Sequence, residues 1–455
     1  MPGLTASLAE FVAALDPARV PEEAARIVQR GLVDCFGVLF AGRDEPVVRL
    51  ARSLVAETDA GPAWILGDRA RCSAPDAALV DAVAAHGLDY DDTGLDGHPS
   101  AVLVPVVVAQ SALVGAGGAE SIAAYVAGYE TWAELVSRDE DSHHAKGWHP
   151  TAVFGTVAAA AAGAALAQLD ASRAAHALGI AASMAAGVVS NFGSMTKPLQ
   201  VGFAARSGLV ATELARRGAP ASIDALEHPR GLLAALSPRG RVRLDGPMRS
   251  DAWRILETGL SIKRYPVCYA AHRAVDAALA MRQSLLARLA DVERIDVDIG
   301  VVQASMLRSH SPTNAADAKF SVEFSVAAAL VFGRLGLAEL TDAVVNEPRV
   351  RDLSARVRVR PIDERDRVDP LFAPFDRLRV TLRDGSVLAS APVRRAKGHA
   401  TLPLSDEDLR QKFFDCARRS LDGDRVEQWW EALARFPSAG GSALHAIAEP
   451  DAARL

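Results

Sequence analysis

The chain has 455 residues, too many for one ordinary hydrophobic core, so we expect at least two domains. Half of the residues are hydrophobic and 23% are charged, which is the composition of a globular protein. The net charge is −6, and the sequence contains neither a basic stripe nor a polybasic amphipathic helix. The composition therefore argues against a nucleic-acid partner and against a membrane surface.

The cysteines and the N-terminus predict a cytoplasmic protein. The sequence contains four cysteines, which lie far apart and form no CxxC pair: Cys35, Cys72, Cys268 and Cys416. This spacing predicts neither a disulfide framework nor a zinc knuckle. The first residues lack a cationic start followed by a strongly apolar run, so they predict no signal peptide.

Residues 5 to about 260 predict helices separated by short breaks. In the first of them Leu8, Phe11 and Val12 recur at helical spacing. Pro21 followed by two glutamates is typical of the first turn of the next helix.

Alanine and glycine are dense in residues 101–130 and 152–190. Small residues let helix backbones approach closely, so this composition predicts a tightly packed helical domain. Residues 151–169 carry no charge over their whole length. Alanine and glycine partition only weakly into lipid, so we expect this segment to be a buried helix rather than a membrane span.

The hydrophobic period changes near residue 290, where the sequence begins to alternate between polar and apolar residues. Alternation in 294–299, 356–360 and 377–382 predicts half-buried strands, and Asp384-Gly385 predicts a hairpin turn. Residues 263–400 therefore predict a smaller α+β domain with an antiparallel sheet.

Residues 406–417 are helical again in pattern, and we expect the last helices to pack back on the first domain. The predicted fold is mainly α. It has a large all-helical domain of residues 1–262 and 403–455, and an α+β domain of residues 263–402.

The densest polar segment lies between two apolar stretches. It places four carboxylates and two histidines within thirteen residues: His86, Asp89, Asp91, Asp92, Asp96 and His98. Burying so many charged groups is costly, whereas Gly94 and Gly97 let the backbone bend so that side chains converge. Composition alone leaves two interpretations open, a catalytic site and a solvated acidic loop with helix caps.

A second polar segment precedes the uncharged helix and contains His149. The positive N-terminal end of a helix attracts anions and lowers the pKa of a nearby histidine, so His149 is a candidate catalytic residue. The alternative is that it only caps the helix. We expect His143 and His144 in the same segment to be surface residues.

Two further segments carry lysines at breaks in the chain. Lys197 follows a long apolar helix and precedes a proline, where it is either a surface residue or a ligand of a substrate carboxylate. Lys263 and Arg264 lie where the helical domain gives way to the mixed one, and clefts between domains are common ligand sites. An interdomain salt bridge is the alternative for Arg264, and a buried apolar packing role is the alternative for Cys268.

These four segments, in this order, resemble the MmgE/PrpD family, which includes 2-methylcitrate dehydratases, cis-aconitate decarboxylases and iminodisuccinate epimerases. The resemblance covers nearly the whole chain and includes residues 31–37, 318–321 and 397–405. It implies a large all-helical domain with a smaller α+β lid, usually in a homodimer. It also implies that neither an iron–sulfur cluster nor an organic cofactor is used. The sequence shows no Cys or His metal spacing and no Gly-rich phosphate loop after a strand, so we predict that no metal or nucleotide is needed.

The resemblance further implies which residues act. By motif it assigns catalytic roles to His98, His149, Asp89 and Lys197, and substrate contacts to Thr93, Lys263 and Cys268. The Asp-Tyr-Asp-Asp-Thr run followed by His-Pro-Ser is more similar to the decarboxylases and epimerases than to the dehydratases. Three departures from the decarboxylases leave the substrate open: Cys268 replaces a histidine, Phe324 replaces a tyrosine, and the stretch from Thr93 to His98 is one residue shorter.

The chemistry of these residues fits that family. Elimination, decarboxylation and epimerisation beside a carboxylate all build up negative charge on carbon, so they need a base, an acid and nearby cations. His98 and His149 supply proton transfer, Asp89 orients a histidine, and Lys197 and Lys263 neutralise carboxylates. We expect His98 and His149 to converge on one pocket at the domain junction.

We therefore predict a cofactor-independent lyase, a dehydratase or a decarboxylase, acting on a small di- or tricarboxylate. One alternative is an epimerase of an iminodisuccinate-like dicarboxylate, and a second is a non-catalytic binding protein that keeps the fold. A magnesium-dependent isoprenoid enzyme is disfavoured. Its acidic motif would be Asp91-Asp92 with Asp96, and no second acidic motif follows downstream.

Overall fold

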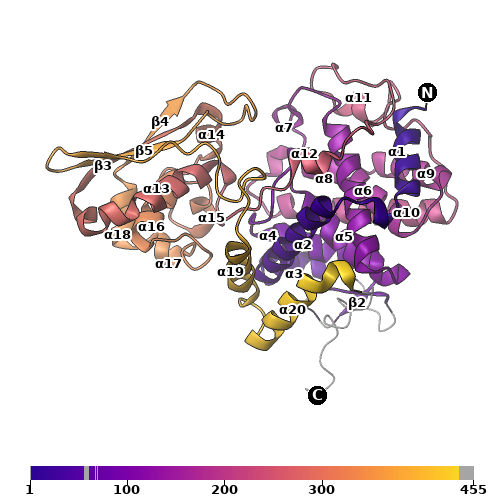
Figure 1. Ribbon diagram of the computed structural model, residues 1–455, viewed down its shortest axis with the longest axis horizontal. Helices are drawn as coiled ribbons and strands as arrows, with labels where there is room; N and C mark the ends of the chain where they lie inside the picture. The colour runs from indigo at the N-terminus through magenta and orange to yellow at the C-terminus, as the bar shows by residue number, and fades with distance from the viewer. Residues whose placement is uncertain (1, 56–60, 67, 69, 440–455) are drawn as a thin grey trace. The chain divides into compact units, whose positions relative to one another are not determined.

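The structure is a computed structural model that describes residues 2–55, 61–66, 68 and 70–439. The described residues form two compact units (Figure 1). The first contains the chain up to Ser261 together with the residues from Asp406 onward, and the second runs from Ile262 to Ser405. The predicted domain segment 403–455 lies outside the described residues from position 440.

The first unit is built mainly from helices. They are α1 (Leu4–Ala14), α2 (Glu22–Gly42), α3 (Pro46–Ser53), α4 (Ala74–Gly87), α5 (Pro99–Val114), α6 (Gly118–Val136), α7 (His143–Lys146), α8 (Pro150–Leu166), α9 (Ala171–Ala182), α10 (Thr196–Arg216), α11 (Leu232–Leu236), α12 (Arg254–Thr258), α19 (Asp406–Ala417) and α20 (Gly423–Arg435).

The first unit departs from an all-helical fold in two places. Strands β1 (Ala63–Trp64) and β2 (Arg71–Cys72) form a short antiparallel pair. Residues 217–253 are mostly irregular and contain only the short helix α11. Proline, glycine and charged residues in that stretch interrupt any helical pattern.

Small residues bring the central helices together as the composition predicts. A Cβ added at Gly208 of α10 would lie 2.3 Å from the Cβ of Ala159 in α8. One added at Gly128 of α6 would lie 2.8 Å from the carbonyl oxygen of Ala158. Helix α8 is therefore packed backbone to backbone between α6 and α10, and almost all of its side chains are buried. Among the residues that the structure describes, no helix is long and apolar enough to cross a membrane.

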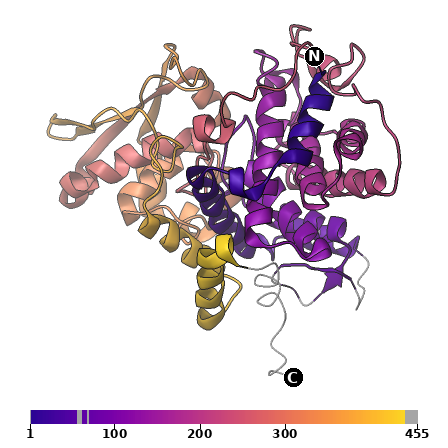
Figure 2. The ribbon, with the colours of Figure 1, turned by 45° about the vertical axis from the view of Figure 1, so that its right-hand side comes forward.

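The last two helices pack against α2, which confirms that the end of the described chain returns to the helical unit. In Figure 2 these yellow helices lie beside the dark helix α2. Trp429 of α20 packs on Phe36 of α2, with ring centroids 5.3 Å apart. The buried Lys412 of α19 pairs with Asp34 at 2.5 Å and donates to the carbonyl of Tyr90 at 2.9 Å. Lys412 therefore connects the C-terminal helices to the segment that carries the acidic cluster.

The second unit contains one four-stranded sheet and helices along it (Figure 1). Its strands have the order β4-β3-β5-β6. The elements are α13 (His272–Leu285), β3 (Val292–Gly300), α14 (Val301–Met306), α15 (Ala315–Ala318), α16 (Val322–Phe332), α17 (Asp342–Val345), α18 (Pro348–Ser354), β4 (Val357–Ile362), β5 (Arg377–Leu382) and β6 (Val387–Ala389).

The strand positions and the hairpin between β5 and β6 match the sequence prediction, but the predicted antiparallel sheet is wrong in one pairing. Strand β3 pairs antiparallel with β5 and parallel with β4, so the sheet is mixed. The chain between β3 and β4 contains five helices, and a crossover of that length allows parallel pairing. Alternation along a strand does not report the direction of its neighbour.

Candidate active site

The acidic segment folds into a turn that aims its side chains inward. Asp89 follows the end of α4 with a φ of 54°, in the left-handed region that non-glycine residues seldom adopt. Gly94 and Gly97 exchange backbone hydrogen bonds of 3.0 and 2.8 Å, and the two residues between them also have positive φ. A Cβ at Gly97 would lie 2.8 Å from Thr151 Oγ1, so the turn packs closely on the start of α8. Such strained backbone is common at functional sites.

His98 ends this segment at the N-cap position of α5. Its Nδ1 lies 2.8 Å from the carbonyl oxygen of Asp92 and 3.0 Å from the Asp91 carboxylate. Both groups accept hydrogen bonds, so Nδ1 carries the proton and Nε2 carries the lone pair. The Nε2 atom lies 3.8 Å from the Asp89 carboxylate.

A second histidine, His86 at the end of α4, shares the Asp91 carboxylate with His98. Its Nδ1 lies 2.9 and 3.0 Å from the two Asp91 oxygens, and both side chains are fully buried. The rings of His86 and His98 meet edge to face at 4.4 Å. Among the described residues, His86 Nε2 has no hydrogen-bond partner.

His149 is the N-cap residue of α8, but its side chain does not cap that helix. Its Nδ1 lies 2.6 Å from Gln200 Oε1, while Gln200 Nε2 donates to the carbonyl of Val188 at 3.1 Å. That second bond fixes Gln200 Oε1 as the acceptor, so His149 Nδ1 is the donor. His149 Nε2 is buried and has no partner among the described residues, so its lone pair is available to a ligand.

Lys197 reaches the same cluster from the second residue of α10. Its Nζ lies 2.9 Å from the Asp89 carboxylate, and both side chains are largely shielded from solvent. Phe192 packs edge-on against the ring of His149 at 4.8 Å and lies 5.1 Å from Lys197 Nζ. The rings of His86 and His149 are 6.4 Å apart. The predicted catalytic residues therefore come together in one place in the first unit.

Three long helices begin at this cluster. His98 precedes α5, His149 precedes α8, and Lys197 lies in the first turn of α10. Helix N-termini carry partial positive charge and unsatisfied N–H groups, which favour bound anions. Together with Lys197 they make a site suited to a ligand with several carboxylates.

Burial and neighbouring charges set the protonation states. Burial, reinforced by His86 and Lys197, lowers the pKa of His149 to about 2. Burial lowers the pKa of His86 to about 4, although Asp91 opposes the shift. Burial also opposes ionisation of Asp91, but His86 and His98 outweigh it and hold the pKa of that carboxyl well below its usual range. The site at neutral pH therefore contains an ionised Asp91 and neutral His86 and His149.

Three further predicted site residues are described by their own surroundings. The Thr93 backbone pairs with Ser261, with N···O distances of 2.8 and 2.9 Å, and its side chain is half-buried. Lys263 and Cys268 belong to the second unit, where Lys263 is buried and Cys268 packs against the hydrophobic core. Their substrate contacts stay predictions.

The prediction that His143 lies on the surface is wrong. The side chain is 2% exposed, and its ring packs edge-on against Phe154 of α8 with centroids 4.9 Å apart. Burial lowers its pKa. His144 is exposed, as expected. The small residues of α8 leave space for the His143 ring beside Phe154. The polar residues next to His143 in the sequence do not indicate that space.

Three residues that complete the cluster are not among the predicted site residues: His86, Asp91 and Gln200. His86 and Asp91 are named above only as members of the polar segment, and Asp91 also in the disfavoured magnesium motif. The sequence does distinguish His86, because it is the single histidine of the alanine-rich segment 74–87. Nothing in the spacing of Gln200 distinguishes it from an ordinary helix residue.

The positive charge of Lys197 at this cluster disfavours a bound metal ion. Four side chains do place one ligand atom each within 4.8 Å of one another: His86, Asp89, Asp91 and His98. The carbonyl of Asp92 requires a proton on His98 Nδ1, which leaves only Nε2 of this residue for a metal. Lys197 beside Asp89 also disfavours a further cation.

The acidic motif does not form a magnesium site of the isoprenoid-enzyme type. Asp91 contacts the two histidines, whereas Asp92 accepts from the backbone N–H and the hydroxyl of Ser100. Asp96 is exposed. The three carboxylates therefore face different surroundings.

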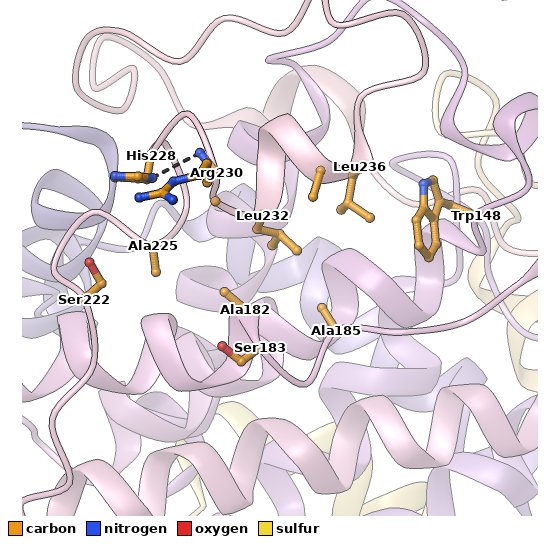
Figure 3. Close-up of a pocket in the computed structure, with 12 residues that line it drawn as sticks. Trp148, Ala182, Ser183, Ala185, Ser222, Ala225, His228, Arg230, Leu232 and Leu236 are labelled. Atoms are coloured by element: carbon orange, nitrogen blue, oxygen red, sulfur yellow. Dashed lines mark hydrogen bonds between the residues drawn. The ribbon is translucent and has the colours of Figure 1, made fainter.

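A separate cavity of about 430 Å³ lies in the first unit (Figure 3). His228, Arg230 and Trp148 line it, together with small residues such as Ala182 and Ser183. None of the histidines of the cluster borders it. This cavity contains no base, acid and cation in mutual contact, so we assign the chemistry to the cluster.

The low pKa of His149 predicts a pH dependence of stability. The unfolded chain takes up a proton near pH 6.5, whereas the folded protein resists protonation of His149 down to about pH 2. The free energy of unfolding therefore falls progressively below pH 6.5, because His149 binds a proton in the unfolded chain and not in the folded protein. Between pH 6.5 and 5, we expect the wild type to lose about 2 kcal/mol more unfolding free energy than His149→Gln. Urea unfolding at the two pH values measures this difference, and parallel losses in both proteins would contradict it.

Comparison with known proteins gives matches along most of the chain. The MmgE/PrpD N-terminal domain matches residues 6–245, and the MmgE/PrpD C-terminal domain matches residues 265–436. The chain is 30% identical to a cis-aconitate decarboxylase of Mus musculus, over 93% of this chain and 88% of the relative. It is 28% identical to the Homo sapiens cis-aconitate decarboxylase, over 92% and 89%. A 2-methylcitrate dehydratase of Cupriavidus necator is 30% identical over 34% of this chain and 35% of its own length.

The chain belongs to the MmgE/PrpD family. It is an enzyme, a lyase of the MmgE/PrpD type.

Proposed function

We propose that this lyase acts on a small tricarboxylate without a cofactor, and that its first candidate reaction is decarboxylation of a cis-aconitate-like acid. The observation that carries the proposal is the convergence of three helix N-termini and Lys197 on His98 and His149, each of which is held through its Nδ1 atom. Decarboxylation is favoured over dehydration because the relatives named as decarboxylases match nearly the whole chain, whereas the dehydratase matches a third of it.

The helix ends and Lys197 bind the carboxylates that stay on the substrate. A carboxylate that displaces Asp89 from Lys197, or bridges to it, gains a charge-assisted hydrogen bond in partly shielded surroundings. The helix N–H groups add positive potential without a titrating group. These contacts strengthen as negative charge spreads into a neighbouring carboxylate during the reaction.

His98 and His149 have different roles in this proposal. His149 offers a buried lone pair at Nε2, but its low pKa makes it a weak base in the free enzyme. A bound carboxylate beside the ring raises that pKa, so His149 suits the base in the complex with substrate. His98 contacts the ionised Asp91, so it suits the group that becomes positively charged and gives up a proton. In decarboxylation the carbon–carboxylate bond breaks, CO2 leaves and its electron pair stays on carbon. Before this step His98 takes up a solvent proton at Nε2 and becomes positively charged beside Asp91. That Nε2 proton then forms the new C–H bond, and His98 returns to its neutral form with the proton on Nδ1.

A screen in D2O tests the proposal. The metal-free protein is incubated with cis-aconitate, with 2-methylcitrate and with an iminodisuccinate-like acid, and NMR follows each carbon skeleton while released CO2 is trapped. We expect CO2 release and one new C–D bond with the cis-aconitate-like acid. Water loss from the citrate-like acid would identify a dehydratase instead. Exchange of a C–H for deuterium without loss of CO2 or water would identify the epimerase. No change in any acid would refute the proposed function.

A further inference from the structure

The carboxylate of Asp91 lies between two imidazole rings. It is 0% exposed, and it contacts the Nδ1 atoms of His86 and His98 at distances of 2.9 to 3.0 Å. A buried carboxylate needs donors for its oxygens, and these two ring N–H groups supply them. Asp91 therefore connects His98 to a histidine in another helix.

The two histidines do not play the same part in this arrangement. His86 is fully buried, and its lowered pKa keeps it neutral at working pH. It therefore orients the Asp91 carboxylate with an N–H bond and adds no compensating charge. The negative charge of Asp91 remains for the other ring that it contacts, that of His98.

A backbone contact also supports the tautomer of His98 that carries its proton on Nδ1. The carbonyl oxygen of Asp92, 2.8 Å from Nδ1, accepts only from an N–H group. The backbone thus fixes which nitrogen carries the proton at rest. A carboxylate on the same N–H adds stabilisation of the positive charge that appears when Nε2 also gains a proton, as in a histidine–aspartate pair.

We infer that His86, Asp91 and His98 form one unit in which neutral His86 orients Asp91, and Asp91 is a positioning residue that compensates the charge of His98 during turnover. Only the role of Asp91 during turnover rests on the proposed function. The effect of Asp91 on the charge of His98 is a property of the folded protein. The family resemblance assigns no role to His86 or to Asp91.

Two neighbouring substitutions test the inference as a matched pair. Asp91→Asn keeps the shape of the side chain and removes the charge. Asp92→Asn changes the next buried carboxyl, whose side chain bonds Ser100 and contacts no histidine ring. Burial and Asp34 raise the pKa of Asp92 to about 8, so it is mostly uncharged at pH 7 and the control changes little charge.

The first measurement is independent of activity. Histidine is labelled with ¹⁵N, and the His98 ring signals are assigned by their loss in His98→Gln. We expect the titration midpoint of the His98 ring to fall by about one pH unit or more in Asp91→Asn and to stay unchanged in Asp92→Asn, because an opposite charge within about 4 Å favours the protonated ring. An unchanged midpoint in Asp91→Asn, or an equal fall in both variants, would overturn the inference.

The second measurement uses the reaction. We expect Asp91→Asn to lower kcat by about 10- to 100-fold with a smaller change in KM, as for other residues that orient a functional histidine. The limb of the pH–rate profile that belongs to His98 should move to lower pH, whereas Asp92→Asn should leave it in place. If the wild type transforms no tricarboxylate, the proposed function fails, and the NMR titration still decides the role of Asp91.

If Asp91→Asn does not fold, substitutions of His86 carry the test. In His86→Asn the side-chain amide takes the place of the ring Nδ1 donor, whereas His86→Leu removes the donor at similar size. We expect kcat of His86→Asn to stay within about threefold of the wild-type value, and kcat of His86→Leu to fall by about tenfold. Equal rates in the two variants would show that the bond to Asp91 does not matter and would overturn the inference.

Discussion

Replacing His98 or His149 by glutamine lowers kcat on the tricarboxylate substrate by about 10²–10⁴-fold, the usual contribution of a general acid or base. Each histidine is held through Nδ1 and presents Nε2, so glutamine keeps a polar side chain but cannot carry the proton. Because the two residues act in the same proton-transfer sequence, the double variant should lose far less than the product of the two single losses.

The control for this prediction is His228→Gln. His228 belongs to the same unit and is half-buried, but it lines the separate cavity and accepts a hydrogen bond from the backbone N–H of Arg230. We expect this variant to keep the wild-type rate. His143 is unsuitable as a control, because its ring is buried against Phe154 and its loss would disturb packing. Full activity of both His98→Gln and His149→Gln would contradict the assignment.

Replacing Lys197 by methionine is expected to raise KM and to lower kcat, with a combined loss of about 10²–10³-fold in kcat/KM. The ammonium group pairs with Asp89 at 2.9 Å and lies 5.1 Å from the ring of Phe192, which packs against His149. It binds a substrate carboxylate before the reaction and stabilises added negative charge during it. Lys197→Arg should recover part of the binding but less of the turnover, because the planar guanidinium cannot take the same position.

The matched control for Lys197 lies on the same helix. Arg206 of α10 pairs with Asp76 at 2.9 Å and is half exposed, away from the cluster. Arg206→Gln removes one positive charge from α10 and should leave KM and kcat unchanged. A similar loss in both variants would mean that Lys197 acts through the general charge of the helix rather than through contact with the substrate.

The sequence was informative about the helix ends. His98 and His149 each stand before a proline at the start of a helix, and Lys197 stands before a proline in a first turn. Such positions can be recognised because proline favours a helix start and polar groups at helix ends escape burial in the core. The structure brings these residues and Asp89 together, and their predicted place in a pocket at the domain junction stays a prediction.

The sequence was less informative about the residues that support them. His86 ends an apolar helix, where an isolated histidine is usually a packed core residue, so only its contact with Asp91 identifies a role. The burial of His143 depends on the space beside Phe154, which is set by the packing of whole helices. In the second unit, alternation located strands β3 and β4, but their parallel pairing depends on the long crossover between them.

A crystal structure with a bound, unreactive tricarboxylate such as tricarballylate tests the central claim most directly. The account predicts one carboxylate within about 2.7–3.2 Å of Lys197 Nζ, and a substrate carbon between the Nε2 atoms of His98 and His149. The contradictory result is a ligand bound elsewhere, for example in the cavity lined by His228 and Arg230, with the histidine cluster unchanged from the free enzyme.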